Sequence, residues 1–316
     1  LWQMFDFLEA AVLAQHLRAQ GVAHLHNHFV DGSCTVAMLC SEMTAIPYSF
    51  TMHGPTEFFS APWWHIGEKV SRAAFVAAIS HFCRSQLMYF SPASVWDRIR
   101  IVHCGVTPAH YGPHEETPAP TVAFVGRLDA VKGTPLLIEA FARVAARHPT
   151  ARLSIIGDGP ERAACEARVA GLGIANRVIF HGYRASEEVA RMLRQVDMLV
   201  LPSFAEGVPV VLMEAMASGI PVIASQVAGV GELVETGVSG FTIPAGDLDT
   251  LTARLDTLLA DPALRARMGQ AGRAKVEAEF DLGREVGWLS QIYEGSLSGA
   301  LPPGLRPVPH HVDETA

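Results

Sequence analysis

Short apolar runs alternate with longer amphipathic segments along the chain, and the alternation is most regular after residue 120. The apolar runs have the length of strands, and the segments between them have helical periodicity. The expected strands are 121–125, 152–156, 178–181, 198–201, 221–224 and 240–243, and the expected helices are 134–147, 161–171, 186–195, 209–218, 229–235, 247–259 and 263–279. Strands joined by helical crossovers predict a complete doubly wound parallel sheet with helices on both faces.

The first part of the chain follows the same pattern less completely. The expected helices are 6–20, 31–44, 63–74 and 81–90, and the expected strands are 22–29, 47–52, 75–80 and 100–103. The pattern opens in a helix without a preceding strand, and the first residue is Leu1 rather than methionine. We therefore expect an incomplete first domain that lacks about 100 N-terminal residues, for domains of the usual size, and that has an exposed sheet edge.

Prolines mark the expected boundaries between the parts of the chain. Pro113, Pro118 and Pro120 lie within residues 111–120, the predicted linker. The expected fold class is α/β, with two Rossmann-like doubly wound domains of which the first is incomplete. The expected parts are a partial first domain (1–112), a second domain (118–282), a helix (283–296) and a disordered tail (297–316) in which His310 and His311 are solvated.

The composition excludes several classes of protein. Of the 316 residues, 49% are apolar and 18% are charged, which suffices for a large core, and the net charge of −8 disfavours a general nucleic-acid binder. The five cysteines are scattered and form no C-x-x-C pair, so neither a disulfide framework nor a zinc ribbon is indicated, and a cytoplasmic location is expected. No apolar run is long enough to span a bilayer.

Two glutamates bracket an apolar stretch that reads EGVPVVLME. Glu214 is the sole formally charged residue between Gly207 and Gly231, and Pro209 suits the first turn of a helix. Glu206 is therefore expected in the loop before a helix, with Glu214 about one turn inside it. A helix N-terminus attracts phosphate, and carboxylates accept hydrogen bonds from hydroxyls, so the stretch suits a sugar nucleotide. The alternative, two acids that merely stabilise the helix, has equal weight on this stretch alone.

The loop after the first strand of the second domain carries two cations. Gly126 permits a tight exit from the strand, and Arg127 and Lys132 follow before the next helix. Such cations can clamp a diphosphate, although a solvated turn is the commoner case. The G-x-G at 157–159 is followed by Arg162 where a dinucleotide fingerprint has glycine, and no Walker motif occurs, which disfavours a dehydrogenase and a Walker-type NTPase.

The segments GRLDAVKG, GDGP, FHGY, LPSFAEGVPVVLMEAMASGIPVIAS and GVSGFTIPAGD together resemble the retaining glycosyltransferases with two Rossmann-like domains (GT-B), and more narrowly glycosyltransferase family 4, over residues 121–293. With SFTMHGP at 49–55, the chain resembles the exopolysaccharide and colanic-acid branch most. The resemblance implies transfer of a sugar, with retention, from a nucleoside-diphosphate sugar to a saccharide or lipid-linked saccharide acceptor. The alternatives are an inactive sugar-nucleotide-binding fragment and, less favoured, a nucleotide-dependent oxidoreductase.

The resemblance also implies roles for individual residues. Arg127 and Lys132 would neutralise the diphosphate, Glu214 would accept from the ribose, and Glu206 would contact the transferred sugar. His53 would face the donor sugar from the first domain. The implied catalytic residues are His53, Arg127, Lys132 and Glu206, and the implied donor-binding residues are Gly126, Arg127, Lys132, His181, Tyr183, Arg184, Glu206, Gly207, Val208, Pro209, Val210, Val211 and Glu214.

No cofactor or metal is expected, because members of the family work without a bound metal. His24, His26 and His28 stand at strand spacing and share one face, which could hold a metal, but we favour ordinary strand histidines. Trp63 and Trp64, followed by Lys69 and Arg72, could touch a membrane surface, and we expect a peripheral contact with the inner membrane face or, equally, aromatic packing.

Overall fold

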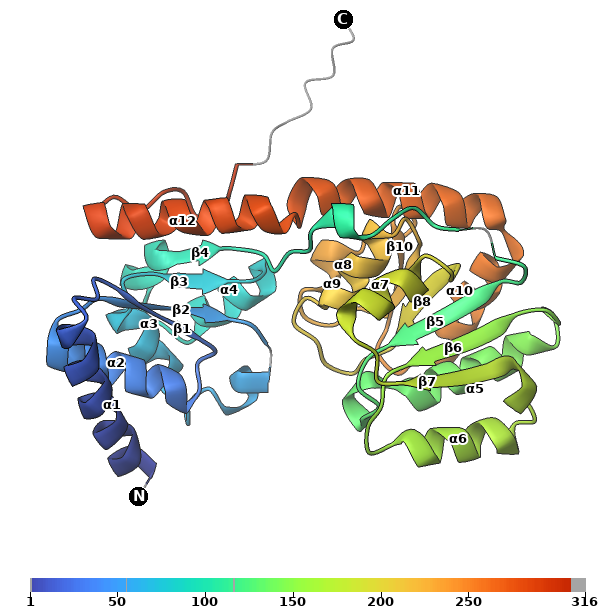
Figure 1. The fold of residues 1–316 in the computed structure, drawn as a ribbon, viewed down its shortest axis with the longest axis horizontal. Helices are drawn as coiled ribbons and strands as arrows, with labels where there is room; N and C mark the ends of the chain where they lie inside the picture. Colours follow the sequence, from blue (N-terminus) through green and yellow to red (C-terminus); the bar gives the residue numbers. More distant parts are fainter. Residues whose placement is uncertain (1, 55, 116, 308–316) are drawn as a thin grey trace, which may run out of the picture. The chain divides into compact units, whose positions relative to one another are not determined.

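The computed structural model describes residues 2–54, 56–115 and 117–307 and divides into two compact units. Unit 1 contains Leu1–His103 and Arg284–Ala316, and unit 2 contains Cys104–Gly283. The division falls before the predicted linker, and residues 284–307 belong with the first unit rather than forming a separate helix and tail. Figure 1 labels the helices and strands of both units.

Unit 1 is built on four parallel strands in the order β1-β2-β3-β4 (Figure 1). β2, β3 and β4 are buried along their whole length, as in a sheet covered on both faces, whereas β1 is polar and partly exposed. β1 stands at one edge and is paired with β2 among the described residues. The elements are α1 (Trp2–Ala19), β1 (Leu25–His28), α2 (Gly32–Thr44), β2 (Tyr48–Met52), η1 (Thr56–Ser60), α3 (Ile66–Arg72), β3 (Val76–Ala78), α4 (His81–Tyr89), η2 (Ala93–Arg98), β4 (Ile99–Ile101) and α12 (Leu282–Ser298), whose first residues lie in unit 2.

The C-terminal segment packs on this sheet instead of forming the disordered tail that the sequence predicts. Trp288 and Ile292 of α12 join a buried cluster with Phe75, and Leu301 packs against it. Beyond α12, the Ile101 amide donates to the carbonyl of Gly304 at 2.8 Å, and Arg306 Nε lies 2.7 Å from Glu285 Oε1. These contacts hold the chain in place as far as Arg306. The predictions for His310 and His311 lie outside the described residues.

Of the two cations predicted to lie beside Trp63 and Trp64, Lys69 is buried, while Arg72 is partly exposed and pairs with Glu42 and Glu68. The helix predicted over 63–74 starts at Ile66, after a series of turns. Lys69 is 1% exposed, and its Nζ donates to the carbonyls of Val30 at 2.7 Å and Asp31 at 2.9 Å. A buried ammonium cannot attract a lipid headgroup, so Lys69 does not contribute to the predicted membrane contact, which stays a prediction. Among the described helices, none is both long and apolar enough to cross a membrane.

Unit 2 has a parallel sheet of six strands in the order β10-β9-β8-β5-β6-β7. The direction of winding reverses between β8 and β5, which is where open sheets of this kind bind ligands. The elements are η3 (Pro108–His110), β5 (Thr121–Val125), η4 (Ala130–Lys132), α5 (Thr134–Ala145), β6 (Arg152–Ile156), α6 (Arg162–Gly171), η5 (Ala175–Arg177), β7 (Val178–Gly182), α7 (Ser186–Leu193), β8 (Met198–Leu201), α8 (Val210–Ala217), β9 (Val222–Ser225), α9 (Val230–Leu233), β10 (Gly240–Ile243), α10 (Leu248–Ala260) and α11 (Pro262–Glu279).

The predicted doubly wound sheet is confirmed, and each of its strands lies within one residue of the expected bounds. The central strand β8 is entirely buried, as its uninterrupted apolar sequence requires. α8 packs against β8 and β9 on one side and against α11 on the other, while α10 packs against α5. Helices therefore cover the sheet. The loops that follow the carboxyl ends of its strands are left available to form a site.

Candidate functional site

Two loops flank the point where the winding of the six-stranded sheet reverses. Residues 126–133 follow β5, and residues 202–207 follow β8. The amide of Phe204 donates to the carbonyl of Val131 at 2.7 Å, which ties the two loops together. The predicted helix start is confirmed within one residue, because α8 begins at Val210 with Pro209 before it.

Lys132 and Glu206 meet at this point. Lys132 Nζ lies 2.6 Å from Glu206 Oε1, and the side chains are 25% and 11% exposed. Both charges are therefore partly desolvated, and each stabilises the other. The pair keeps a limited exposure to solvent, greater at Lys132 than at Glu206.

Backbone packing holds the loop that carries Lys132. Gly133 has φ of 64°, and a Cβ there would lie 2.2 Å from the carbonyl oxygen of Pro202. Gly157, with φ of 139°, approaches so closely that a Cβ would lie 1.9 Å from the carbonyl oxygen of Gly126. No L side chain fits either position, because such distances are far inside van der Waals contact. The strand-end loops are therefore locked against one another.

Arg127 does not join the Lys132–Glu206 pair. Its side chain is 71% exposed, and its Nε lies 3.6 Å from Asp129 Oδ2. It lines a cleft of about 440 Å³ together with Gly126, Tyr183 and Arg184, three other predicted donor-binding residues. The structure thus gathers four predicted residues around one cleft, with the side chain of Arg127 largely exposed.

His181 lies beside that cleft, on β7. Its Nε2 is 2.7 Å from the Ser154 hydroxyl oxygen. Burial, and to a smaller degree the charge of Arg184, lowers the pKa of His181, so the ring is neutral near neutral pH. Tyr183 is exposed, and Arg184 donates to the Tyr183 carbonyl at 3.1 Å. The side chains of Tyr183 and Arg184 are thus presented at the surface, where a base can stack or bond.

The N-terminus of α8 is open to an anion. Pro209, the residue before the helix, makes no side-chain capping hydrogen bond to the first N–H groups of α8. Val208 and Pro209 are buried, whereas Val210 is exposed and Val211 is half-buried. The carbonyl of Gly207 accepts from the Gly229 amide at 3.1 Å, which fixes the turn before the helix.

Ser203 lies in the same loop and was not among the predicted site residues. It is fully buried, and its hydroxyl has no hydrogen-bond partner among the residues that the structure describes. A buried hydroxyl without a partner is costly, so this atom is a candidate for contact with a bound ligand or water.

Glu214 stands inside α8 and contacts Tyr111, a residue that sequence reasoning missed. The Tyr111 hydroxyl donates to Glu214 Oε1 at 2.8 Å. Burial raises the pKa of Glu214, and the hydrogen bond from Tyr111 offsets part of that effect. Tyr111 stands at the start of the predicted linker, and nothing in the local sequence signals that contact.

His53 belongs to unit 1 and pairs with another histidine. Its Nε2 lies 2.7 Å from His28 Nδ1, and the two rings stack with centroids 5.0 Å apart. Burial and the neighbouring His28 lower the pKa of His53. One ring nitrogen must donate and the other accept, which restricts the tautomers of both residues. The catalytic role expected for His53 stays a prediction.

The other histidines of β1 and its approach bond to hydroxyls. His24 Nε2 and His26 Nδ1 each lie 2.7 Å from Ser49 Oγ, and His26 Nε2 lies 2.8 Å from Thr51 Oγ1. Burial, followed by the neighbouring histidines, lowers the pKa of His26 to about 3. Within residues 2–54, 56–115 and 117–307, no group of three or more histidine, cysteine, aspartate or glutamate side chains is arranged to hold a metal.

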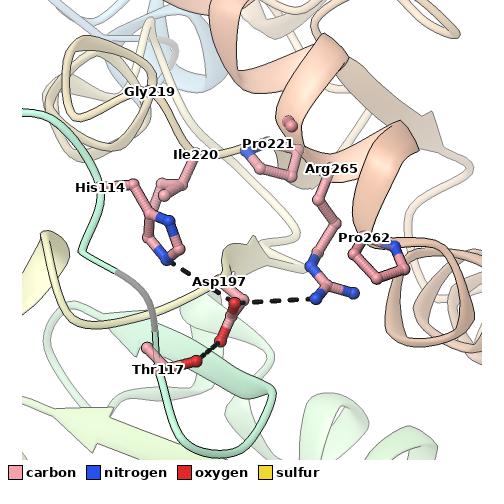
Figure 2. A pocket seen from close by; sticks show the side chains of 9 residues that line it. His114, Thr117, Asp197, Gly219, Ile220, Pro221, Pro262 and Arg265 are labelled. Atoms are coloured by element: carbon pink, nitrogen blue, oxygen red, sulfur yellow. Dashed lines mark hydrogen bonds and ion pairs between the residues drawn. The ribbon is translucent and has the colours of Figure 1, made fainter.

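A separate cavity of about 230 Å³ lies at the amino ends of the strands of the six-stranded sheet (Figure 2). Asp197, just before β8, accepts from the Thr117 hydroxyl at 2.6 Å and the Thr121 amide at 2.8 Å. His114 and Arg265 also point toward its carboxylate, at 3.6 Å and 3.8 Å. These contacts attach part of the predicted linker to unit 2. We therefore interpret the side chains around this cavity as structural.

The family described as "Glycosyl transferases group 1" matches residues 112–275. The chain is 33% identical to the alpha-D-kanosaminyltransferase of Streptomyces kanamyceticus over 174 residues, which are 55% of this chain and 45% of that protein. It is 34% identical to the D-inositol 3-phosphate glycosyltransferase of Corynebacterium efficiens over 228 residues, 66% of this chain and 54% of that protein. The chain spans about half the length of the curated relatives that it matches.

Solved structures show the same fold. Sucrose-phosphate synthase from Thermosynechococcus elongatus has a TM-score of 0.82 at 24% identity, over 92% of this chain and 78% of that one. Anabaena HepE, solved in complex with UDP, has a TM-score of 0.80 at 22% identity, over 90% of this chain and 82% of that one. The arrangement of parallel sheets is thus that of the GT-B glycosyltransferases, as the sequence predicts.

Proposed function

Because the chain belongs to the group 1 glycosyl transferases, we propose that it transfers a sugar from a nucleoside-diphosphate sugar to an acceptor. The observation that carries the proposal is the Lys132–Glu206 pair, at the reversal point of the sheet and beside the uncapped start of α8. A cation, a helix dipole and an acid within one pair of loops suit a phosphate linked to a sugar.

Lys132 and Arg127 act on the leaving group. Negative charge develops on the diphosphate as its bond to the sugar breaks, and fixed cations stabilise that charge more in the transition state than in the ground state. Lys132 exchanges Glu206 for a phosphate oxygen, and Arg127 moves in from its exposed position. Glu206 then accepts from hydroxyls of the transferred sugar, and Glu214 accepts from those of the ribose.

We further propose retention of the anomeric configuration and a saccharide or lipid-linked saccharide as acceptor, in exopolysaccharide biosynthesis. The basis is the resemblance of the motifs, together with 34% identity to the amylovoran biosynthesis glycosyltransferase AmsK of Erwinia amylovora over 176 residues. We propose a uridine nucleotide as the first donor to test, since HepE is solved with UDP and with UDP-glucose. Anomeric NMR of the product distinguishes retention from inversion.

Calorimetric titration tests donor binding directly. UDP-glucose, GDP-mannose, UDP and GDP are titrated into the full chain, with adenosine diphosphate as the control. Saturable binding of one sugar nucleotide is expected, and release of its diphosphate with an acceptor present would establish transfer. Absence of binding by every nucleotide sugar in a broad panel would overturn the proposal, and binding without transfer would reduce the chain to a sugar-nucleotide-binding fragment.

A further inference from the structure

Tyr111 is attached to α8 at two points. Its hydroxyl donates to Glu214 Oε1 at 2.8 Å, inside the helix. At the end of the helix, Arg273 Nη1 donates to the carbonyl of Tyr111 at 3.0 Å and to that of Ala217 at 2.7 Å. The Tyr111 amide also donates to the carbonyl of Pro108 at 3.1 Å, which closes η3. The tyrosine is therefore held in place along its backbone and at its hydroxyl.

The contact leaves most of the carboxylate available. An ionised glutamate accepts about four hydrogen bonds over its two oxygens, and the Tyr111 hydroxyl takes one of these at Oε1. Glu214 is half-buried rather than sealed from solvent. A neutral donor that fixes one oxygen of a partly desolvated acid orients the other oxygen and makes ionisation less costly.

We propose that Tyr111 is a positioning residue of the donor site, whose hydroxyl fixes one oxygen of Glu214 and directs the other at the ribose hydroxyls. This inference rests on the proposed function, because it assigns the ribose to Glu214. Tyr111 itself does not touch the reacting bond. Its effect passes through Glu214, and Arg273 acts one step further out by holding the backbone of Tyr111.

The surroundings of Glu214 make the effect of Tyr111 measurable. Strands β8 and β9, packed against α8, have no titratable side chain. The remaining elements packed against it carry His110 on η3, with Tyr111 directly after it, Glu187, Glu188 and Arg191 on α7, and Arg265, Arg267, Arg273, Lys275, Glu277 and Glu279 on α11. Of these groups, Tyr111 is the one that the structure shows altering the pKa of Glu214, downward, against the larger upward effect of burial.

The sign of the pH dependence follows from that balance. Ribose hydroxyls bind better to an ionised acceptor, so donor affinity falls as the pH drops through the pKa of Glu214 in the free chain. Removing the Tyr111 hydroxyl takes away the influence that lowers this pKa. The fall in affinity then begins at a higher pH in Tyr111→Phe than in the wild type.

The test is calorimetric titration of UDP-glucose, or of whichever sugar nucleotide the wild type binds, from acidic to neutral pH. We expect Tyr111→Phe to bind about tenfold more weakly at neutral pH, as for loss of one hydrogen bond to a charged group, with its acid limb moved to higher pH. Tyr89→Phe is the matched control, since Tyr89 is an exposed tyrosine of unit 1. Glu214→Gln should abolish the acid limb, and adding Tyr111→Phe to it should weaken binding less than in the wild type.

Each outcome has one meaning. A wild type that binds no nucleotide sugar overturns the proposed function and this inference with it. A wild type that binds, with Tyr111→Phe unchanged in affinity and pH profile, overturns the inference alone. Should Tyr111→Phe fail to fold, Arg273→Met removes both carbonyl contacts and keeps the hydroxyl, and it should move affinity and the acid limb in the same direction. An unchanged profile in Arg273→Met would then contradict the inference.

Discussion

A shielded carboxylate lies near a cation at the amino ends of the strands of the six-stranded sheet, and another lies near a cation at their carboxyl ends. The two carboxylates differ in their hydrogen-bond partners. Asp197 at the amino edge is 7% exposed and receives hydrogen bonds from Thr117 and from the Thr121 backbone, with Arg265 nearby. Glu206 at the carboxyl edge is 11% exposed, and its recorded partner is Lys132. A carboxylate with several fixed donors is a structural fastening, whereas one held by a single flexible ammonium can change partners when a ligand arrives.

Lys132→Ala should have the largest effect. If the ammonium stabilises the leaving diphosphate, its loss lowers the transfer rate by about 10²–10³. Lys275→Ala is the matched control, because Lys275 is similarly shielded and pairs with Glu279 on α11. Steady-state kinetics with saturating donor measures the effect. A Lys132→Ala variant with full activity would show that the Lys132–Glu206 pair, like the contacts of Asp197, is structural.

Asp197→Asn should lower the stability of the fold without changing donor binding. The amide oxygen can still accept from Thr117 and Thr121, which both bond Oδ2, but the negative charge is lost and an NH2 group would face the Arg265 guanidinium. We therefore expect a loss of about 2–3 kcal/mol in the free energy of unfolding. Donor affinity of the folded variant should be unchanged. Urea denaturation measures the first and calorimetry the second, with Asp256→Asn, a more exposed aspartate, as the control. Weaker donor binding at unchanged stability would contradict this assignment, because Asp197 at the amino edge would then have a role in ligand binding.

Glu214→Gln should stabilise the free chain while weakening donor binding. The pKa of Glu214 is raised in the folded state, so unfolding releases a proton between the unfolded and the folded pKa. The stability contributed by this group is therefore fully present below the unfolded pKa and is lost as the pH rises through the folded pKa. Thermal unfolding should show Glu214→Gln more stable than the wild type at neutral pH, with the difference vanishing in acid. Equal stability at neutral pH would contradict the desolvation of Glu214.

Arg127→Ala should have the smallest effect on the fold. The side chain is largely exposed, and its ion pair with Asp129 is long, so the free energy of unfolding should stay within about 0.5 kcal/mol. Donor affinity should nevertheless fall by about tenfold, because a charge-assisted contact to phosphate is lost. Arg143→Ala, at another exposed ion pair, serves as the control. Unchanged affinity would remove Arg127 from the diphosphate clamp.

The six-stranded sheet could be predicted because each strand is a continuous apolar run between breakers. β5, β6, β8 and β10 have the expected bounds. The packing of residues 299–307 could not, since proline-rich composition indicates disorder, while the contacts that fix this segment come from residues distant in the sequence. The Gly304 carbonyl meets Ile101, and Arg306 meets the buried Glu285.

Some residues of the candidate site could likewise be predicted from the sequence, and others could not. Lys132 and Glu206 could be named because each stands in a motif, and the topology explains why strand-end loops meet. Tyr111 lies in a segment whose prolines suggest only a linker, and its partner Glu214 is 103 residues away in the sequence. Lys69 reads as a surface cation until the carbonyls of Val30 and Asp31 are brought to it by the fold.

The close approach of Gly157 to Gly126 limits how the cleft beside it can be redesigned. Any side chain at residue 157 would collide with the Gly126 carbonyl, so the variant would have to displace one loop bodily. A redesign that widens this cleft must therefore change residues such as Tyr183 or Arg184, which also line it, and keep Gly157. Libraries randomised at residue 157 should return glycine alone among the folded members.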